Sequence, residues 1–303
     1  MFDLVTVGHF AVDSILSPKM AVPRHTLGGP PTYVSLAAKK LDAKVSVISK
    51  VGEDFSEEYI EWLNANCIDL SGLQRVEDAL TTRFTLKYSK EERRLQLQSQ
   101  APPILPEDIS DSLQARVIHV APIANELSAD VVDKLRTSAE TLSLDPQGFV
   151  RRFDGEGSVS LKRWRDSHIL EQIDLYKSSA SEIRMVTEST DLRPAMEKIH
   201  DYGVKAVIVT KGVKGSILLH EKRFYEIPAC KPRIIRDLTG AGDALIGAFL
   251  AEHIRGKDPV WCMCVGSAAA SFVVEGIGPA IFGEKTDVYQ RASEIYEKGL
   301  LSY

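Results

Sequence analysis

The chain has 303 residues, 44% of them hydrophobic and 26% charged, an ordinary composition for one large α/β domain or two small ones. The formal net charge of −5, without a long block of one sign, argues against a nucleic-acid partner bound through a general basic surface. The four cysteines are too few for a disulfide framework and no apolar run reaches the ~18 residues of a membrane span, so we expect a cytoplasmic protein without a membrane partner.

Short apolar runs alternate with stretches of helical periodicity over most of the chain. Strands are predicted at 4–8, 44–49, 116–122, 141–146, 174–179 and 206–212, and helices at 33–41, 128–140 and 191–202. Strands separated by helices indicate a mostly parallel sheet that is covered on both faces. In such a sheet, ligands bind at the carboxyl ends of the strands.

Residues 81–101 break this pattern. Polar and apolar residues alternate there on both sides of a charged turn at 89–92, which predicts a hairpin with one buried and one solvent-exposed face. Such an insertion is either an edge decoration or a lid over a site. Because the chain has no linker rich in proline or glycine and no internal repeat, we predict a single domain over 1–303.

The last part of the chain is mainly helical in pattern. A helix that begins at 241 meets its stop signal at Gly256. The almost uncharged segment 259–276 predicts a buried helix, and the polar, amphipathic segment 285–299 predicts a helix on the surface.

The start of the helix at 241 carries Gly240-Ala241-Gly242 followed directly by Asp243. N–H groups at a helix start lack intrahelical partners, glycine allows a ligand close to the backbone, and the helix dipole adds positive charge. This loop therefore favours an anion such as a phosphate, and Asp243 beside it suits a reaction that removes a proton from a hydroxyl. The alternative is a tight glycine turn in which Asp243 only stabilises the helix start.

The run from Asp237 to Asp243, DLTGAGD, looks like the D-[TL]-T-G-A-G-D signature of the ribokinase-like (PfkB) carbohydrate and nucleoside kinases. Gly28-Gly29, the helix at 33–41 and the segment 51–54 are similar to the N-terminal block of that family. The order of these features matches over essentially the full chain. The resemblance implies a three-layer α/β/α sandwich with a mostly parallel central sheet and a small β lid, built here from about 10–27 and 81–101.

The resemblance also implies an ATP-dependent phosphotransferase. Asp243 would be the base that activates the acceptor hydroxyl, and the N–H groups of Gly240, Ala241 and Gly242 would bind the transferring phosphoryl group. Glu182 would act on Mg²⁺ through water, and some members of the family bind a monovalent cation near the same loop. The implied nucleotide contacts are Lys211, Gly212, Gly215, Thr239, Gly242 and Ala270.

The acceptor is a small polyol, sugar or nucleoside by the same resemblance. Asp13 matches the early acid that accepts hydrogen bonds from sugar hydroxyls, although it also suits a turn. Arg83 is equally compatible with a solvent-facing charge on the hairpin. The candidate acceptor contacts are Asp13, Gly28, Gly29, Thr32, Arg83, Gln96, Asp145 and Gln147.

Two departures from the family pattern bear on the acceptor. The segment 30–33 lacks the asparagine that usually reads a sugar hydroxyl, and Ser179 replaces the asparagine of the N-x-x-E motif, whereas Glu182 is retained. Plant and archaeal myo-inositol kinases of this fold show similar features, so we expect myo-inositol as the acceptor. The alternatives are a nucleoside or other sugar kinase of the same fold and a non-catalytic sugar-binding sensor. Exposed lid edges would also allow a homodimer.

Overall fold

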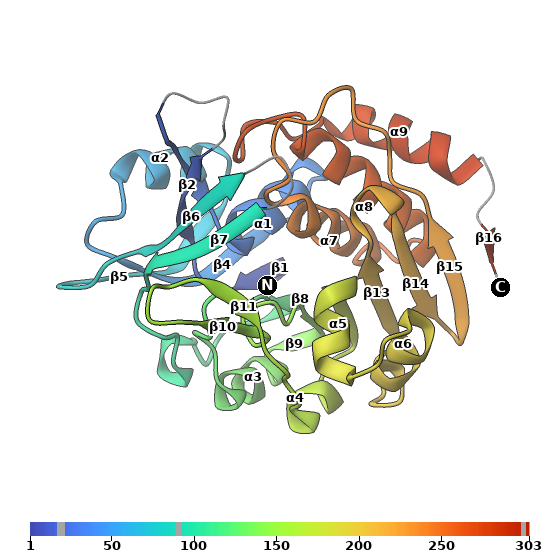
Figure 1. Ribbon diagram of the computed structural model, residues 1–303, viewed down its shortest axis with the longest axis horizontal. Helices are drawn as coiled ribbons and strands as arrows, with labels where there is room; N and C mark the ends of the chain where they lie inside the picture. Colours follow the sequence, from blue (N-terminus) through green and yellow to red (C-terminus); the bar gives the residue numbers. More distant parts are fainter. Residues whose placement is uncertain (17–21, 89–92, 298–300, 303) are drawn as a thin grey trace.

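The computed structural model describes residues 1–16, 22–88, 93–297 and 301–302. Its centre is a ten-stranded sheet with the order β16-β15-β14-β13-β12-β9-β8-β1-β4-β5 (Figure 1). The strands from β5 to β13 pair in parallel, and β13 to β16 pair antiparallel. The strand bounds are β1 Phe2–Val7, β4 Val45–Gly52, β5 Asp69–Val76, β8 Ala115–Val120, β9 Ala139–Leu144, β12 Leu175–Ser179, β13 Ala206–Thr210, β14 Ser216–His220, β15 Arg223–Ile227 and β16 Leu301–Ser302.

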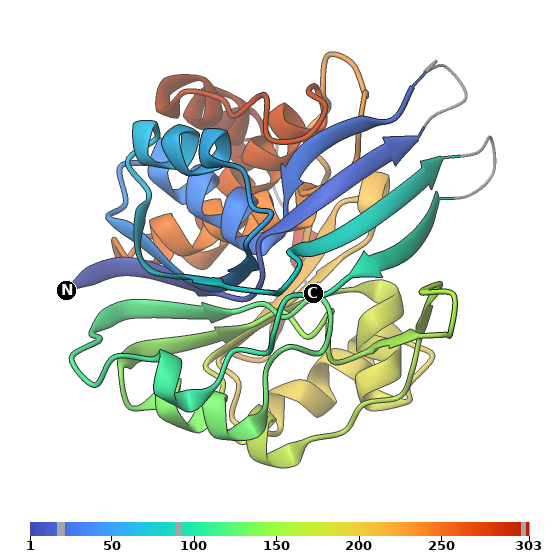
Figure 2. The same ribbon diagram turned by 90° about the vertical axis from the view of Figure 1, so that its left-hand side faces the viewer.

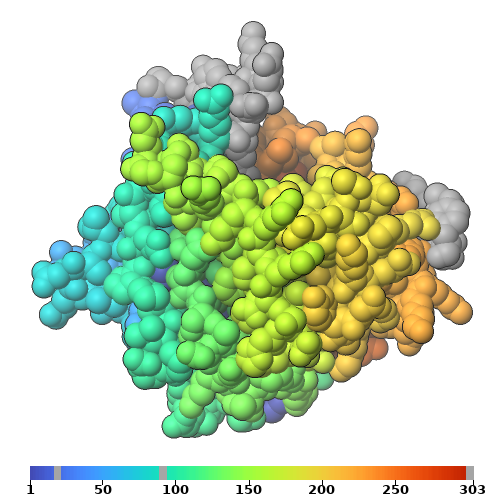
Figure 3. Space-filling view, turned by 60° about the horizontal axis from the view of Figure 1, so that its bottom comes forward, coloured from blue at the N-terminus to red at the C-terminus, as the bar shows by residue number. Residues whose placement is uncertain are grey.

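Helices cover both faces of this sheet, as Figure 2 shows from the side. One face is covered by α1 (Pro30–Lys40), α2 (Glu57–Ala65), α7 (Ala241–His253), α8 (Pro259–Val273) and α9 (Lys285–Glu297). The other is covered by α3 (Ala129–Arg136), α4 (Ser167–Glu171), α5 (Ala180–Thr187) and α6 (Leu192–His200), which form the green to yellow surface of Figure 3. The predicted three-layer sandwich is confirmed, and its two hydrophobic cores lie on either side of the sheet.

A second sheet stands beside the large one, and we call it the small sheet. Its order is β3-β2-β6-β7, with β2 and β6 parallel and the other pairs antiparallel (Figure 2). Its strands are β2 Ala11–Leu16, β3 Arg24–Gly28, β6 Thr82–Tyr88 and β7 Arg93–Ser99. The hairpin of β10 (Arg151–Phe153) and β11 (Val159–Leu161) lies next to β7 through a bridge between Gln96 and Ser158. The predicted turn at 89–92 lies outside the described residues.

Several predicted boundaries differ from the structure. The helix predicted over 128–140 ends at Arg136, because the chain turns at Thr137 and Ser138 and then pairs with β8 as β9. The last predicted helix, at 285–299, is described only as far as Glu297. Within the described ranges, no helix is long and apolar enough to cross a membrane.

Candidate active site

The candidate site is centred on the start of α7. Gly240 is the N-cap with a φ of 76°, and a Cβ there would meet the ring of Tyr33 at 2.2 Å, so only glycine fits this turn. Because Gly240 is the N-cap, Ala241 and Gly242 are the first two residues of α7. The N–H groups of this turn have no partners inside the helix, which makes it a binding place for an anion.

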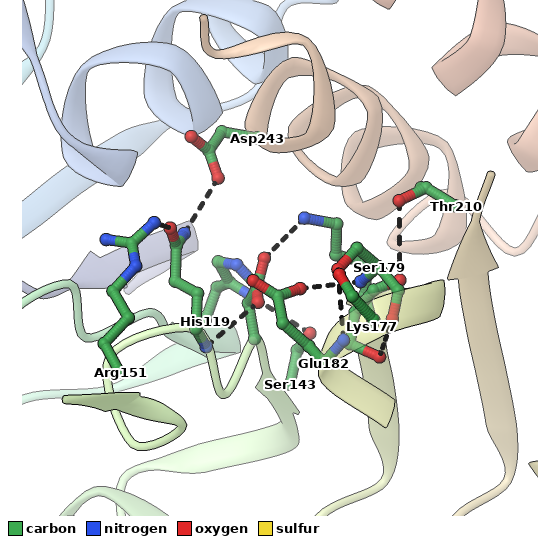
Figure 4. A network of polar contacts seen from close by, with 12 residues as sticks. His119, Ser143, Arg151, Lys177, Ser179, Glu182, Thr210 and Asp243 are labelled. Carbon is green, nitrogen blue, oxygen red and sulfur yellow. Dashed lines mark hydrogen bonds and ion pairs between the residues drawn. The ribbon is translucent and has the colours of Figure 1, made fainter. Parts of the chain in front are cut away.

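Asp243 lies in the first turn of α7, and a chain of hydrogen bonds connects it to residues that follow β9 (Figure 4). Nε2 of Gln147 donates to Oδ1 of Asp243 at 3.3 Å. Oε1 of Gln147 accepts from Arg151 at 2.7 Å, and Arg151 also donates to the carbonyl of Ile123 at 3.0 Å. Asp243 is thus oriented by an amide whose own rotation is fixed by a guanidinium.

The environment of Asp243 favours a proton acceptor. Burial raises the pKa of this carboxyl above its ordinary value, and the positive charges of Lys177 and Arg151 offset only part of that effect. A carboxylate with a raised pKa is a stronger base than a solvated one. It suits the removal of a proton from a hydroxyl near neutral pH.

A buried ion pair lies directly below the anion-binding turn. Nζ of Lys177, on β12, is 2.5 Å from Oδ2 of Asp145 at the end of β9. Burial raises the pKa of Asp145 to about 7 against the opposing charge of Lys177. Burial lowers the pKa of Lys177, but the carboxylates of Asp145, Asp243 and Glu182 more than offset it, so its pKa is raised and it stays charged. The site therefore holds a fixed positive charge.

Glu182 faces this group from the start of α5. Its Oε2 accepts the N–H of Ser179 at 2.7 Å, and Oγ of Ser179 accepts the N–H of Glu182 at 3.3 Å. This reciprocal pair is a capping box, which gives Ser179 a structural role at the start of α5. One carboxylate oxygen of Glu182 is thereby committed to the helix start.

A cavity of about 350 Å³ opens beside Ala241 and Gly242. Gly212 and Gly215 line it at the β13–β14 connection, and Ala270 lines it from α8. Its walls are small and mainly apolar, and within the described residues no charged side chain lines it. It therefore suits an uncharged planar ring with a phosphate chain directed at α7.

Two predicted nucleotide contacts lie outside the walls of this cavity. Nζ of Lys211 is 3.3 Å from Glu226 on β15, so the ammonium forms an ion pair there and does not face the cavity. The hydroxyl of Thr239 donates to Asp237 at 2.7 Å, which stabilises the turn before α7. Thr239 thus supports the loop from within, and the structure gives Lys211 no place in the cavity.

The predicted acceptor residues around Gly28 come together. Asp13, on β2, is 5% exposed, and a Cβ on Gly28 would lie 2.2 Å from its Oδ2, so glycine makes room for this carboxylate. Gly29 is the N-cap of α1 with a φ of 83°. Thr32 is fully buried and its hydroxyl donates to the carbonyl of Gly28 at 2.7 Å, so it supports the turn.

Arg83 and Gln96 are not brought to this site. Side chains alternate between the faces of a strand, and the register pairs Asp13 with Phe84, which places Arg83 and Gln96 on the opposite face of the small sheet. Arg83 forms an ion pair with Asp54 at 2.6 Å, and Nε2 of Gln96 donates to the carbonyl of Glu156 at 2.7 Å. The interpretation of these two residues as acceptor contacts is corrected accordingly.

Lys177 and Arg151 are functional candidates that the sequence analysis missed. Lys177 carried a usable signal, since a lysine inside the apolar strand pattern LYKSS needs a buried anionic partner. Arg151 sits in the run FVRRFD, where nothing distinguishes it from the exposed Arg152. No group of three or more His, Cys, Asp or Glu side chains suited to a metal ion occurs in the part of the chain that the structure describes.

The order of these features along the chain is the order found in a known family, since the pfkB carbohydrate kinase family matches residues 1–286. The chain belongs to the pfkB family of carbohydrate kinases. This kinase is therefore a phosphotransferase with a hydroxyl acceptor.

Individual relatives differ in their acceptors. The kinase is 29% identical to the cytidine kinase of Thermococcus kodakarensis, over 92% of this chain and 98% of that protein. It is 26% identical to the inositol 3-kinase of Arabidopsis thaliana, over 92% of this chain and 76% of that protein. The structure of a pyrophosphate-dependent kinase in the ribokinase family superposes with a TM-score of 0.81 at 23% identity, over 95% and 99% of the two chains, which confirms the ribokinase-like fold.

Proposed function

We propose that this kinase transfers the γ-phosphoryl group of ATP to a hydroxyl of a nucleoside, with Asp243 as the base. Asp243 takes the proton of the acceptor hydroxyl, whose oxygen then bonds to the γ-phosphorus while the bond from that phosphorus to ADP breaks. The N–H groups at the start of α7 bind the transferring oxygens, and the charge of Lys177 lies directly beneath them. The observation that carries this proposal is the half-buried carboxylate of Asp243 in the first turn of α7.

The cavity beside Ala241 supports ATP as the donor. Its volume of about 350 Å³ and its apolar walls suit a purine and its ribose, whereas pyrophosphate would leave them unused. Glu182 fits the predicted role toward Mg²⁺, because one of its oxygens accepts from Ser179 and the other is available to a water ligand of the ion. Mg²⁺ supplies charge neutralisation on the donor phosphates. The monovalent cation stays a prediction.

The inner face of the small sheet supports a nucleoside as the acceptor. Phe84 and Leu86 are buried on this face, which they share with Asp13 by register, and the half-buried Leu95 and Leu97 continue it as an apolar surface. A nucleoside offers ribose hydroxyls to a carboxylate and an apolar ring face to such a surface. The similarity to a cytidine kinase supports an acceptor that has both a ribose and a ring.

The second candidate acceptor is myo-inositol. Gln147 contacts the proposed base and Arg151 holds Gln147, so an acceptor with hydroxyls on every carbon would use these polar groups more fully than a nucleoside does. The similarity to an inositol 3-kinase favours it as well. A non-catalytic sensor would have no use for a carboxylate of raised pKa beside the anion-binding turn.

The test is ADP release from Mg-ATP with a panel of nucleosides, pentoses, hexoses and cyclitols. We expect turnover with a nucleoside, and a loss of about 10²–10⁴-fold in kcat for Asp243→Asn. Asp287→Asn is the matched control, because Asp287 occupies the first turn of α9 and is exposed. Turnover confined to cyclitols would select the second candidate. Equal rates for the wild type and Asp243→Asn would refute the assignment of the base.

A further inference from the structure

The small sheet reaches the anion-binding turn through one side chain. The hydroxyl of Tyr88, at the end of β6, donates to Oδ1 of Asp237 at 2.7 Å and lies 3.3 Å from Oγ1 of Thr239. Asp237 and Thr239 are 4% and 8% exposed, so this hydrogen bond is largely shielded from solvent. It joins the sheet that carries Asp13 to the residues immediately before Gly240.

The strand register explains why Tyr88 reaches this place. Phe84, Leu86 and Tyr88 alternate with outward-facing residues on β6, so all three point from the face that carries Asp13. Phe84 and Leu86 are buried on that face, and Tyr88, last in the row, projects beyond them to the turn. The acceptor side of the site and the phosphoryl-binding turn are therefore connected by adjacent side chains of one strand.

Asp237 organises the turn that Tyr88 touches. Its Oδ1 accepts the N–H of Thr239 at 3.0 Å and the hydroxyl of Thr239 at 2.7 Å, and its Oδ2 accepts the N–H of Gly278 at 3.2 Å. The small sheet meets this arrangement a second time, because a Cβ on Gly278 would lie 2.0 Å from Oγ1 of Thr26 on β3. Asp237 is thus held at Oδ1 by Tyr88 of the small sheet and at Oδ2 by Gly278, which packs against Thr26 of that sheet.

We propose that Tyr88 is a positioning residue for phosphoryl transfer. By holding Asp237, it keeps the turn at 237–242 in the geometry that receives the γ-phosphoryl group. The inference rests on the proposed use of ATP. Because the turn binds the terminal phosphoryl group and supplies only Leu238, Ala241 and Gly242 to the cavity wall, removal of the Tyr88 hydroxyl weakens the phosphoryl interaction more than the contacts of the nucleoside part of the donor.

The test compares the dissociation constants of Mg-ADP and of the β,γ-imido analogue of Mg-ATP by calorimetry. For Tyr88→Phe we expect the constant of the analogue to rise about 10-fold more than the constant of ADP, since the lost hydrogen bond is made to a carboxylate. Thr85→Val is the matched control, because Thr85 loses a hydroxyl on the outer face of the same strand. Partial unfolding of a variant would raise both constants by the same factor and would leave their ratio unchanged.

A double-mutant cycle completes the test. If Tyr88 acts through Asp237, the double variant Asp237→Asn with Tyr88→Phe loses less binding free energy for the analogue than the sum of the losses in the two single variants. An unchanged ratio of the two constants in Tyr88→Phe, or strict additivity in the cycle, overturns the inference. Wild-type protein that binds neither nucleotide would instead refute the proposed donor, so the two failures are distinguishable.

Discussion

The ammonium of Lys177 lies 2.9 Å from the point that a Cβ on Gly242 would occupy. This lysine rises from β12 under the first turn of α7, and its partner Asp145 prevents it from swinging away. The glycine at position 242 thus does more than give the backbone freedom, since its missing side chain lets a buried cation approach the turn that we propose as the phosphate-binding site.

The first prediction concerns Gly242→Ala. The added methyl group would displace Lys177 from Asp145 or shift the turn, and we expect kcat to fall about 10-fold with a smaller change in the KM of the acceptor. Steady-state kinetics with the best acceptor of the panel measures both constants. Gly155→Ala is the control, because nothing lies within 4 Å of a Cβ at that position. Equal kinetics of both variants would contradict the proposed role of Lys177.

The buried pair predicts a second result, on stability. Lys177→Met leaves Asp145 buried without its partner, and we expect the free energy of unfolding to fall by about 3–5 kcal/mol. The double variant Lys177→Met with Asp145→Leu recovers part of this loss but no activity. Denaturant titration measures the change, and Lys285→Met, which breaks an exposed pair with Asp42, is expected to cost about 1 kcal/mol or less. A double variant that is less stable than Lys177→Met would argue against this account.

The pH dependence of kcat/KM follows from the surroundings of Asp243. The base must be ionised, so activity falls as the pH decreases through its pKa, and burial places this pKa above the ordinary value of 3.8. Arg151→Met removes a positive charge that lowers the pKa, so the acid limb should move to higher pH. The exposed neighbour Arg152 supplies the control Arg152→Met, for which the limb should stay in place. A shift to lower pH in Arg151→Met would reverse the assigned sign.

The next prediction concerns the size of the side chain at position 270, in the wall of the donor cavity. Ala270→Leu fills space beside the predicted ring position, and we expect the KM of ATP to rise about 10-fold while the KM of the acceptor stays constant. Kinetics with pyrophosphate in place of ATP adds a second measurement, because a donor without a ring does not meet this side chain. The control is Ala65→Leu, at the exposed end of α2. An ATP KM that Ala270→Leu leaves unchanged would place the ring elsewhere.

Residues close together in the chain were the ones that sequence analysis located correctly. The parallel strands β1, β4, β8, β9, β12 and β13, the helix at 241 and the loop from Asp237 to Asp243 each depend on a local pattern of apolar residues, glycines and caps. The parallel strand β5, the hairpins β14–β15 and β10–β11 and helix α2 were missed, because their local patterns are weak.

The sequence by itself determined the fold class, the family and the place of Asp243 at the start of a helix, since these are set by short motifs whose backbone geometry is local. Only the tertiary structure decided which side chains share the site. It moved Arg83 and Gln96 to the far face of the small sheet, because one residue of register reverses the direction of every side chain. It brought Lys177 beneath Gly242 and Tyr88 onto Asp237, since contacts between distant segments depend on how strands and helices pack rather than on any one segment.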